Sequence, residues 1–232
     1  MSRAPQIVAI GGAGFAPESE LLLRFILGLT GEARPRVCFL PTATGDSREH
    51  ILRFYEAFAK LECAPSHLEL FGAPSREPAH EHLLAQDAIH VGGGNTANML
   101  AVWRVHGIDE VLRAAWRRGI VLSGTSAGAN CWFEAATTDS FGPIAPLRDG
   151  VGLIPGSFSP HYDAEPERRP AYLRLVAGGF PPGYAADDAV ALHFRDRVLV
   201  EVVAAGDGHA YRVERGADGA AEETPLGVRR LG

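Results

Sequence analysis

The amino-acid sequence predicts an α/β fold: a doubly wound, mostly parallel sheet with helices on both faces. Short apolar runs rich in Val, Ile and Leu alternate with amphipathic segments through the first two-thirds of the chain. Most of these runs end at glycine or proline. Helices between buried strands indicate βαβ units, which require a parallel sheet covered on both sides.

The first half of this pattern opens with a strand over residues 6–10, which is closed by glycines. Apolar residues at helical spacing then predict a helix over 18–29. A second strand, 37–40, stops at a proline, and the next helix, 48–61, follows Ser47 as its N-cap.

The pattern continues with strands over 67–71 and 88–91, the second of which runs into three glycines. Helical spacing predicts helices over 96–105 and 108–117, and the latter ends at a glycine. A fifth strand, 120–122, leads into a turn of small residues.

The last third has a different pattern, with strands or an extended crossing over 151–154 and 157–161 and a helix over 169–176. Alternating runs at 189–194, 198–204 and 210–214, separated by glycines, predict a C-terminal antiparallel hairpin. Neither a repeat nor a linker interrupts the sequence. We therefore expect a single domain over residues 1–232.

Composition excludes several classes of function. The net charge of -6 argues against a nucleic-acid partner, because such binding depends on a basic surface. The apolar runs are too short to span a bilayer, so we expect no membrane association. The chain does not open with a basic segment followed by an apolar run, so we expect no signal peptide and a cytoplasmic location.

Metal and disulfide chemistry are also not expected. The three cysteines, Cys38, Cys63 and Cys131, are odd in number and widely spaced, which predicts buried, reduced thiols. His80 and His82 form an H-x-H pair without a third ligand nearby, and we expect them to be solvated at the surface.

The strongest motif is Gly124-Thr125-Ser126-Ala127-Gly128, which matches G-x-S-x-G between a buried strand and a helix-forming segment. A sharp strand-to-helix turn exposes such a serine in a strained conformation, and its small neighbours permit close approach. The following amide, of Ala127, is then placed to bind an oxyanion. Taken alone, the motif also fits a glycine-rich turn in which the serine caps a helix.

A second glycine motif, Gly92-Gly93-Gly94-Asn95-Thr96, follows the strand at 88–91. Parallel strands end at one edge of a sheet, so this loop can meet the serine turn there. We expect Gly93 or Gly94 to supply a second oxyanion donor, although a phosphate cradle or a plain turn would use the same glycines.

These two motifs, followed by Pro160-His161-Tyr162-Asp163, resemble the peptidase E family of aspartyl dipeptidases and cyanophycinases over residues 6–194. The resemblance implies a fold similar to that of class I glutamine amidotransferases. It also implies a serine peptidase with Ser126 as nucleophile and His161 as base, acting on short peptides without a cofactor or metal. Dimerisation is expected from the family alone.

The resemblance places the triad acid on a late segment just before a strand, where Asp188 is the best-aligned carboxylate. Asp replaces the Glu of the dipeptidase pattern here. Asp187, Asp139 and Glu134 remain alternatives. We expect Asn95 and Arg168 to contact the substrate. Cleavage of Asp-X dipeptides, release of a C-terminal residue and cyanophycinase-like activity are all open.

Two other classes of function remain. An α/β-hydrolase esterase would use the order Ser, acid, His, for example Ser126, Asp163 and either His193 or His209. A non-catalytic small-molecule binder would use the glycine loops for phosphate. The spacing of Gly11-Gly12-Ala13-Gly14 does not match a dinucleotide fingerprint, which argues against the binder.

Overall fold

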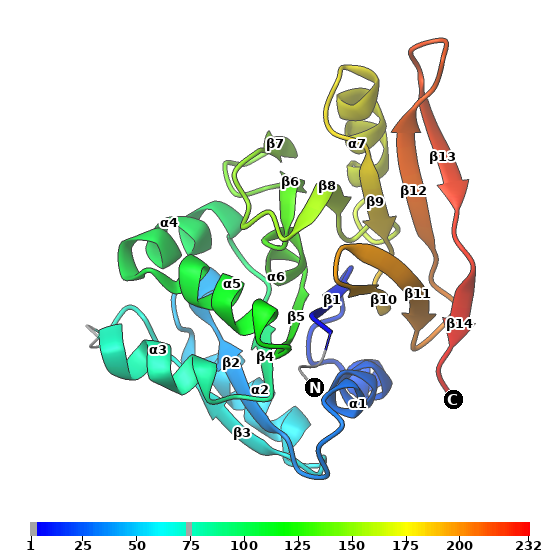
Figure 1. Cartoon of the computed structure of the whole chain (residues 1–232). Coiled ribbons are helices and arrows are strands. Elements are labelled where there is room, and N and C mark those ends of the chain that lie inside the picture. The colour runs from blue at the N-terminus through cyan, green and yellow to red at the C-terminus, as the bar shows by residue number, and fades with distance from the viewer. Residues whose placement is uncertain (1–3, 73–75) are drawn as a thin grey trace.

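The computed structural model describes residues 4–72 and 76–232. Within these residues the strands form two sheets, one of eight strands and one of six. Figure 1 shows helices on both faces of the larger sheet. The smaller sheet lies beside it, next to α7.

The larger sheet has the order β14-β11-β10-β1-β5-β4-β2-β3. Its neighbours from β1 to β3 pair in parallel, and their bounds are β1 (Gln6–Ile10), β5 (Val121–Thr125), β4 (Ala88–Val91), β2 (Arg36–Leu40) and β3 (Ala64–His67). Because these strands are parallel, their C-terminal ends meet at one edge of the sheet.

Helices cover both faces of this sheet. Successive side chains of β1 point to opposite faces of the sheet and belong to two apolar clusters. Val8 packs with α1 (Glu20–Leu29) and α2 (Arg48–Phe58), whereas Ile7 packs with the helices on the other face. The opposite layer consists of α3 (Arg76–Leu84), α4 (Thr96–His106) and α5 (Ile108–Arg117). The predicted doubly wound, mostly parallel α/β fold is therefore confirmed. Short 3₁₀ turns, η1 (Pro17–Ser19) and η2 (Thr42–Thr44), follow β1 and β2.

The C-terminal part of the chain extends the larger sheet. β10 (Val190–Arg195) pairs antiparallel with β1, and β11 (Val198–Ala204) pairs antiparallel with β10, which confirms a hairpin over these residues. The short strand β14 (Val228–Arg230) forms the outer edge.

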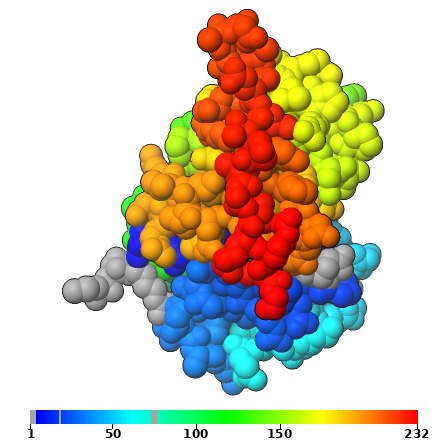
Figure 2. Space-filling model, turned by 90° about the vertical axis from the view of Figure 1, so that its right-hand side faces the viewer, coloured from blue at the N-terminus to red at the C-terminus, as the bar shows by residue number. Residues whose placement is uncertain are grey.

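The smaller sheet has the order β13-β12-β9-β8-β6-β7. Its strands are β6 (Phe133–Thr138), β7 (Ala145–Leu147), β8 (Ile154–Ser159), β9 (Gly183–Ala186), β12 (Ala210–Arg215) and β13 (Ala221–Pro225). The helix α7 (Arg168–Ala177) packs on it through Tyr172 and Val176. The segment from β13 to β14 runs along one side of the molecule and joins the edges of both sheets (Figure 2).

Residues 210–214 also form an antiparallel hairpin, but with β13 and not with β11: β12 lies between β13 and β9 in the smaller sheet. Asp187 and His209 explain the change of sheet. Two hydrogen bonds join these residues. The Asp187 amide donates to the His209 carbonyl at 3.0 Å, and the His209 amide donates to the Asp187 carboxylate at 2.8 Å. These bonds direct the chain away from β11.

Several boundaries also differ from the predicted ones. The strand expected at 67–71 lies earlier, at β3, because the Asp46 carboxylate accepts the amides of Leu70 and Phe71 and draws the chain out of the sheet. The strand expected at 151–154 begins only at its last residue, in β8. The helix α3 and the strands β6, β7, β9, β13 and β14 were not predicted.

The three cysteines have the burial that was predicted for them, whereas the two histidines of the H-x-H pair do not. Cys38, Cys63 and Cys131 are buried and unpaired, and burial raises the pKa of Cys38 to about 12. The solvated position expected for His80 and His82 was wrong. Both are half-buried on α3, where His80 contacts the His106 carbonyl at 3.0 Å and His82 contacts the Ser66 hydroxyl at 3.1 Å.

Among the described residues no three His, Cys, Asp or Glu side chains are grouped as a metal site would require. In the same part of the chain, every helix is too short or too polar to cross a bilayer.

The packing of the serine turn against β4 generates a stability prediction. A Cβ on Gly128 would lie 2.2 Å from the Val91 carbonyl oxygen, so Gly128→Ala must displace backbone. We expect it to lower the free energy of unfolding by more than about 2 kcal/mol, measured by urea denaturation. The matched control is Gly28→Ala, in the last turn of α1 with open space around the new Cβ, which should raise stability by up to about 1 kcal/mol. Equal stability of the two variants would contradict this account of the turn.

Candidate active site

Ser126 lies in a strained turn between β5 and the short helix α6 (Ala127–Asn130). Its φ of 56° and ψ of -112° fall outside the regions that side-chain-bearing residues ordinarily occupy, at a cost of about 1–3 kcal/mol. The Ser126 amide donates to the Ile10 carbonyl at 3.0 Å, and its carbonyl accepts the amides of Ala129 and Asn130 at 2.9 Å. The strained serine expected from the motif is confirmed, and these bonds hold it in place.

The glycines of the motif permit this turn. A Cβ on Gly124 would lie 2.2 Å from the carbonyl oxygen of Gly128, so the two arms of the turn touch at the backbone. Gly128 in turn touches Val91 at the end of β4. The spacing G-x-S-x-G therefore reflects two backbone contacts, one within the turn and one to the neighbouring strand.

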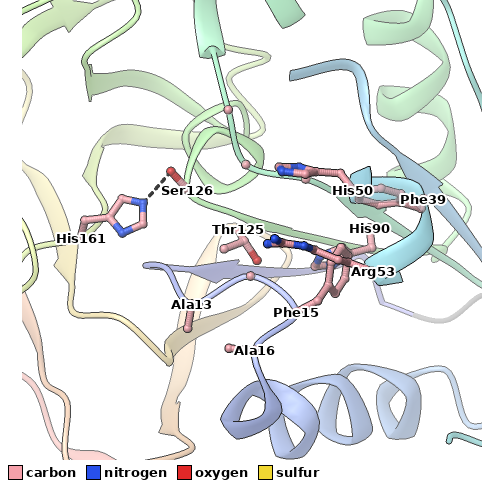
Figure 3. Close-up of a pocket in the computed structure, with 14 residues that line it drawn as sticks. Ala13, Phe15, Ala16, Phe39, His50, Arg53, His90, Thr125, Ser126 and His161 are labelled. Atoms are coloured by element: carbon pink, nitrogen blue, oxygen red, sulfur yellow. Dashed lines mark hydrogen bonds between the residues drawn. The ribbon is translucent and has the colours of Figure 1, made fainter. Parts of the chain in front are cut away.

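A chain of hydrogen bonds joins Ser126 to the smaller sheet. The Ser126 hydroxyl lies 2.8 Å from His161 Nε2, the contact drawn in Figure 3, and His161 Nδ1 lies 2.7 Å from Asp188 Oδ1. The strands β8 and β9 are parallel neighbours, and His161 and Asp188 follow their C-terminal ends. The parallel pairing of β8 and β9 is what brings the histidine and the carboxylate together.

The other candidate carboxylates have different partners. The Asp187 carboxylate accepts the His209 amide at 2.8 Å, and burial raises its pKa. Asp139 lies 3.9 Å from Arg168 Nη2, and Glu134 accepts the Gly156 amide at 3.0 Å. Of the four carboxylates considered, Asp188 is the one in contact with His161.

Gly12, which sequence analysis did not place in the site, borders this contact. A Cβ there would lie 1.8 Å from Asp188 Oδ1 and 2.5 Å from His161 Nδ1, so a larger residue would separate the pair. The signal was available, because Gly11 and Gly12 follow β1, which pairs in parallel with β5 beside the serine turn. The glycine spacing of this loop was informative only against a dinucleotide fingerprint, which it does not match.

The expected oxyanion donors lie around Ser126. A Cβ on Gly93 would be 3.3 Å from the Ser126 Cβ, so this part of the glycine loop contacts the serine, as expected for adjacent strands β4 and β5. Gly94 lines the same cavity, and its φ of 134° requires a glycine. Among the described residues, the amides of Gly93, Gly94 and Ala127 have no hydrogen-bond acceptor.

A cavity of about 540 Å³ opens beside Ser126 and His161. Phe15 and Phe39 form an aromatic wall with ring centroids 5.3 Å apart, and Arg53 and His50 reach in from α2 (Figure 3). Apart from His90 in β4, the remaining lining residues are small: Ala13, Gly14, Ala16, Gly92, Gly93, Gly94 and Thr125.

His90, which is buried in β4, also lines this cavity. Its ring stacks on Phe39 at 6.1 Å, and its Nδ1 lies 3.0 Å from the Ser123 hydroxyl. Burial lowers the pKa of His90 to about 4, so the imidazole is uncharged at neutral pH. The aromatic part of the cavity lining, Phe15, Phe39 and His90, is therefore uncharged at neutral pH.

The two expected substrate-binding residues, Asn95 and Arg168, are not among the described residues that line the cavity. Asn95 caps α4, since its side chain accepts the Asn98 amide at 2.8 Å. Arg168 is 2% exposed and donates to the Glu165 carboxylate at 2.8 Å and to the Thr137 carbonyl at 3.2 Å. Their hydrogen bonds assign both side chains to internal contacts.

The residues of the esterase alternative are not brought together. The Asp163 carboxylate accepts the Asp188 amide at 2.9 Å and so supports the Asp188 segment. His193 lies in β10 between Gln6 and Glu201, at 3.0 and 3.2 Å. His209 pairs with Asp187 at 3.6 Å. Neither histidine hydrogen-bonds Ser126, which corrects that alternative.

The C-terminal strands hold the residues next to His161 and Asp188. The Tyr162 hydroxyl donates to the Glu223 carboxylate at 2.6 Å, and burial together with this bond raises the Tyr162 pKa. Arg169 ion-pairs with Glu223 and lies over the rings of Tyr162 and Tyr211. Strand β13 thereby fixes the backbone that carries His161.

A serine in a strand-to-helix turn, bonded to a histidine that is bonded to an aspartate, is the arrangement of a serine hydrolase. Residues 7–202 match the sequence model of peptidase family S51. The chain belongs to that family and is a serine peptidase.

Similar proteins agree with the family match. The chain is 48% identical to the "Uncharacterized peptidase YgaJ" of Bacillus subtilis over 231 residues, which cover 98% of this chain and 99% of that protein. It is 31% identical to "Peptidase E" of Streptomyces coelicolor over 137 residues, covering 58% of this chain and 54% of that one. The crystal structure of a peptidase from an acI-B1 Actinobacterium has the same fold, with a TM-score of 0.76 and 17% identity over 98% of this chain and 96% of that one.

The contact at Gly12 generates a prediction about activity. We expect Gly12→Ala to lower kcat by at least about 100-fold, because the new Cβ displaces Asp188 from His161 and loss of this orientation is costly in serine hydrolases. The variant should remain folded, since the displaced atoms belong to side chains. The measurement is kcat in the single variants and in Gly12→Ala/Asp188→Ala. If Gly12 acts through Asp188, the double variant is barely worse than Asp188→Ala; additive losses would contradict this role.

Proposed function

We propose that this serine peptidase hydrolyses short peptides at one end, through Ser126 as nucleophile, His161 as general base and Asp188 as the group that orients His161. The observation that carries the proposal is the continuous contact from Ser126 Oγ to His161 Nε2 at 2.8 Å and from His161 Nδ1 to Asp188 at 2.7 Å. Both distances are within hydrogen-bond reach, as nucleophilic catalysis requires.

In this mechanism His161 removes the hydroxyl proton as Ser126 attacks the peptide carbonyl. Asp188 fixes the imidazole tautomer and stabilises the imidazolium that forms. The unpaired amides of Ala127 and of Gly93 or Gly94 bind the tetrahedral oxyanion, each contributing about 3–4 kcal/mol. His161 then protonates the leaving amine, and water releases the acyl group from Ser126.

The size of the cavity supports a short substrate. About 540 Å³ is the volume of a small-molecule site, and it holds a peptide residue or two beside Ser126. The name "Peptidase E" carried by a relative favours cleavage of Asp-X dipeptides. Removal of a C-terminal residue is the second mode of cleavage that we propose.

Substitution of the serine tests the proposal. Ser126→Ala should lower kcat toward short peptides by about 10⁴- to 10⁶-fold, because the nucleophile is lost. The panel contains Asp-X dipeptides, N-blocked peptides with a free C-terminus, and peptides blocked at both ends, with hydrolysis measured by chromatography. Cleavage confined to one of the first two classes identifies the end that is recognised.

A covalent probe provides the control for folding and for the role of His161. A fluorophosphonate should label the native protein at Ser126, and labelling should be lost in His161→Ala while the thermal transition is retained. Activity of Ser126→Ala equal to that of the native protein would remove this serine from the mechanism. Labelling that survives His161→Ala would remove the histidine.

A further inference from the structure

We propose that Arg53 and His50 recognise a carboxylate of the substrate in the cavity beside Ser126; this inference rests on the proposed function and names its specificity. The two residues lie three positions apart on α2, so they project from the same face of the helix. Figure 3 shows both side chains pointing into the cavity toward the side where Ser126 lies.

The charge of the cavity favours an anionic ligand. Among the described lining residues Arg53 is the one permanent charge, and no carboxylate lines the cavity. His90 is uncharged, because burial lowers its pKa to about 4. In a protein with a net charge of -6, a cavity with this lining is a local site for an anion.

Arg53 retains the donors that carboxylate recognition needs. One terminal nitrogen, Nη2, bonds the Glu49 carboxylate at 2.6 Å across one turn of α2. A guanidinium has five N–H groups in a planar fork, so donors remain for a second carboxylate. The side chain is 60% exposed and also borders a neighbouring groove, which places it at the mouth of the cavity.

The position of His161 indicates which carboxylate of the substrate Arg53 binds. In Figure 3 His161 lies on one side of Ser126, whereas Arg53 and His50 lie on the other. The leaving amine must approach His161 to be protonated, so the residue that remains attached to Ser126 fills the cavity. Its acidic side chain is the carboxylate that this arrangement places on the side of Arg53. The C-terminal carboxylate of a dipeptide belongs to the leaving residue, so it would reach Arg53 only if the substrate bound in the opposite direction.

This inference transfers the role expected of Arg168 to a different element. Arg168 is 2% exposed and donates hydrogen bonds to Glu165 and Thr137. Its guanidinium therefore stabilises the packing of α7 and does not reach the cavity. Arg53 makes one ion pair at the surface and reaches the cavity.

The test compares four dipeptides: Asp-Leu, Asn-Leu and the C-terminal amide of each. In Arg53→Gln we expect kcat/KM for Asp-Leu to fall about 10- to 100-fold, the value of a hydrogen bond to a charged group, with little change for Asn-Leu. The matched control is Arg24→Gln, because Arg24 makes the same one-turn ion pair, with Glu20 at 2.8 Å, outside the cavity. Loss of an exposed pair of this kind should change kcat/KM by less than about threefold.

The pattern of losses among the four dipeptides distinguishes a side-chain carboxylate from the C-terminal carboxylate. A loss that follows the acidic side chain supports recognition of the acyl residue. A loss that appears only when the C-terminus is free supports carboxylate recognition with the terminus as its source. Equal losses for all four dipeptides, or none, would overturn the proposal.

Binding without turnover separates this inference from the proposed mechanism. Calorimetry with Ser126→Ala should show preference for Asp-Leu over Asn-Leu, and the preference should disappear in Ser126→Ala/Arg53→Gln. Adding His50→Gln should weaken Asp-Leu binding alone. Absence of any preference for a carboxylate in Ser126→Ala would overturn the inference even if the native protein cleaves peptides. Fluorophosphonate labelling of Arg53→Gln at the native rate shows that the hydrolytic residues are intact.

Discussion

The strained backbone of Ser126 is the constraint on which the rest of the site depends. A residue with φ of 56° and ψ of -112° persists only where its surroundings hold it. The central position of β5, between β1 and β4, supplies those surroundings: the Ser126 amide bonds to β1, and Gly128 packs against the end of β4. A serine on an edge strand would lack one of these two supports and would relax into an ordinary turn.

The smaller sheet supplies the hydrogen-bond partners of this turn. The larger sheet carries Ser126 and the glycine loops, but His161 and Asp188 follow β8 and β9. Because these two strands are parallel, their ends carry the histidine and the carboxylate side by side. The C-terminal strands then hold the neighbours, through Glu223 to Tyr162 and His209 to Asp187. The hydrogen-bonded chain at the site therefore depends on how the two sheets are joined.

The sequence predicts those parts of the site whose positions follow directly from the order of strands and turns. Apolar runs and glycine turns place Ser126 and Gly93 at one edge, because parallel strands must end there. Family resemblance supplies His161 and Asp188. The roles of Arg53 and Arg168 could not be predicted, since the sequence does not show which way the side chain of either arginine points from its helix. Packing of α7 buries one guanidinium, and the direction of α2 turns the other into the cavity.

The residues proposed for the reaction and those proposed for substrate recognition come from different elements. The hydrogen-bonded residues come from turns after β5, β8 and β9, whereas the walls come from the segment after β1, from β2 and from α2. Changes in α2 can therefore alter the charge at the cavity mouth without moving Ser126 or His161. Differences among related peptidases in the residue they cleave are thus expected to arise on this wall, while the strained serine turn stays the same.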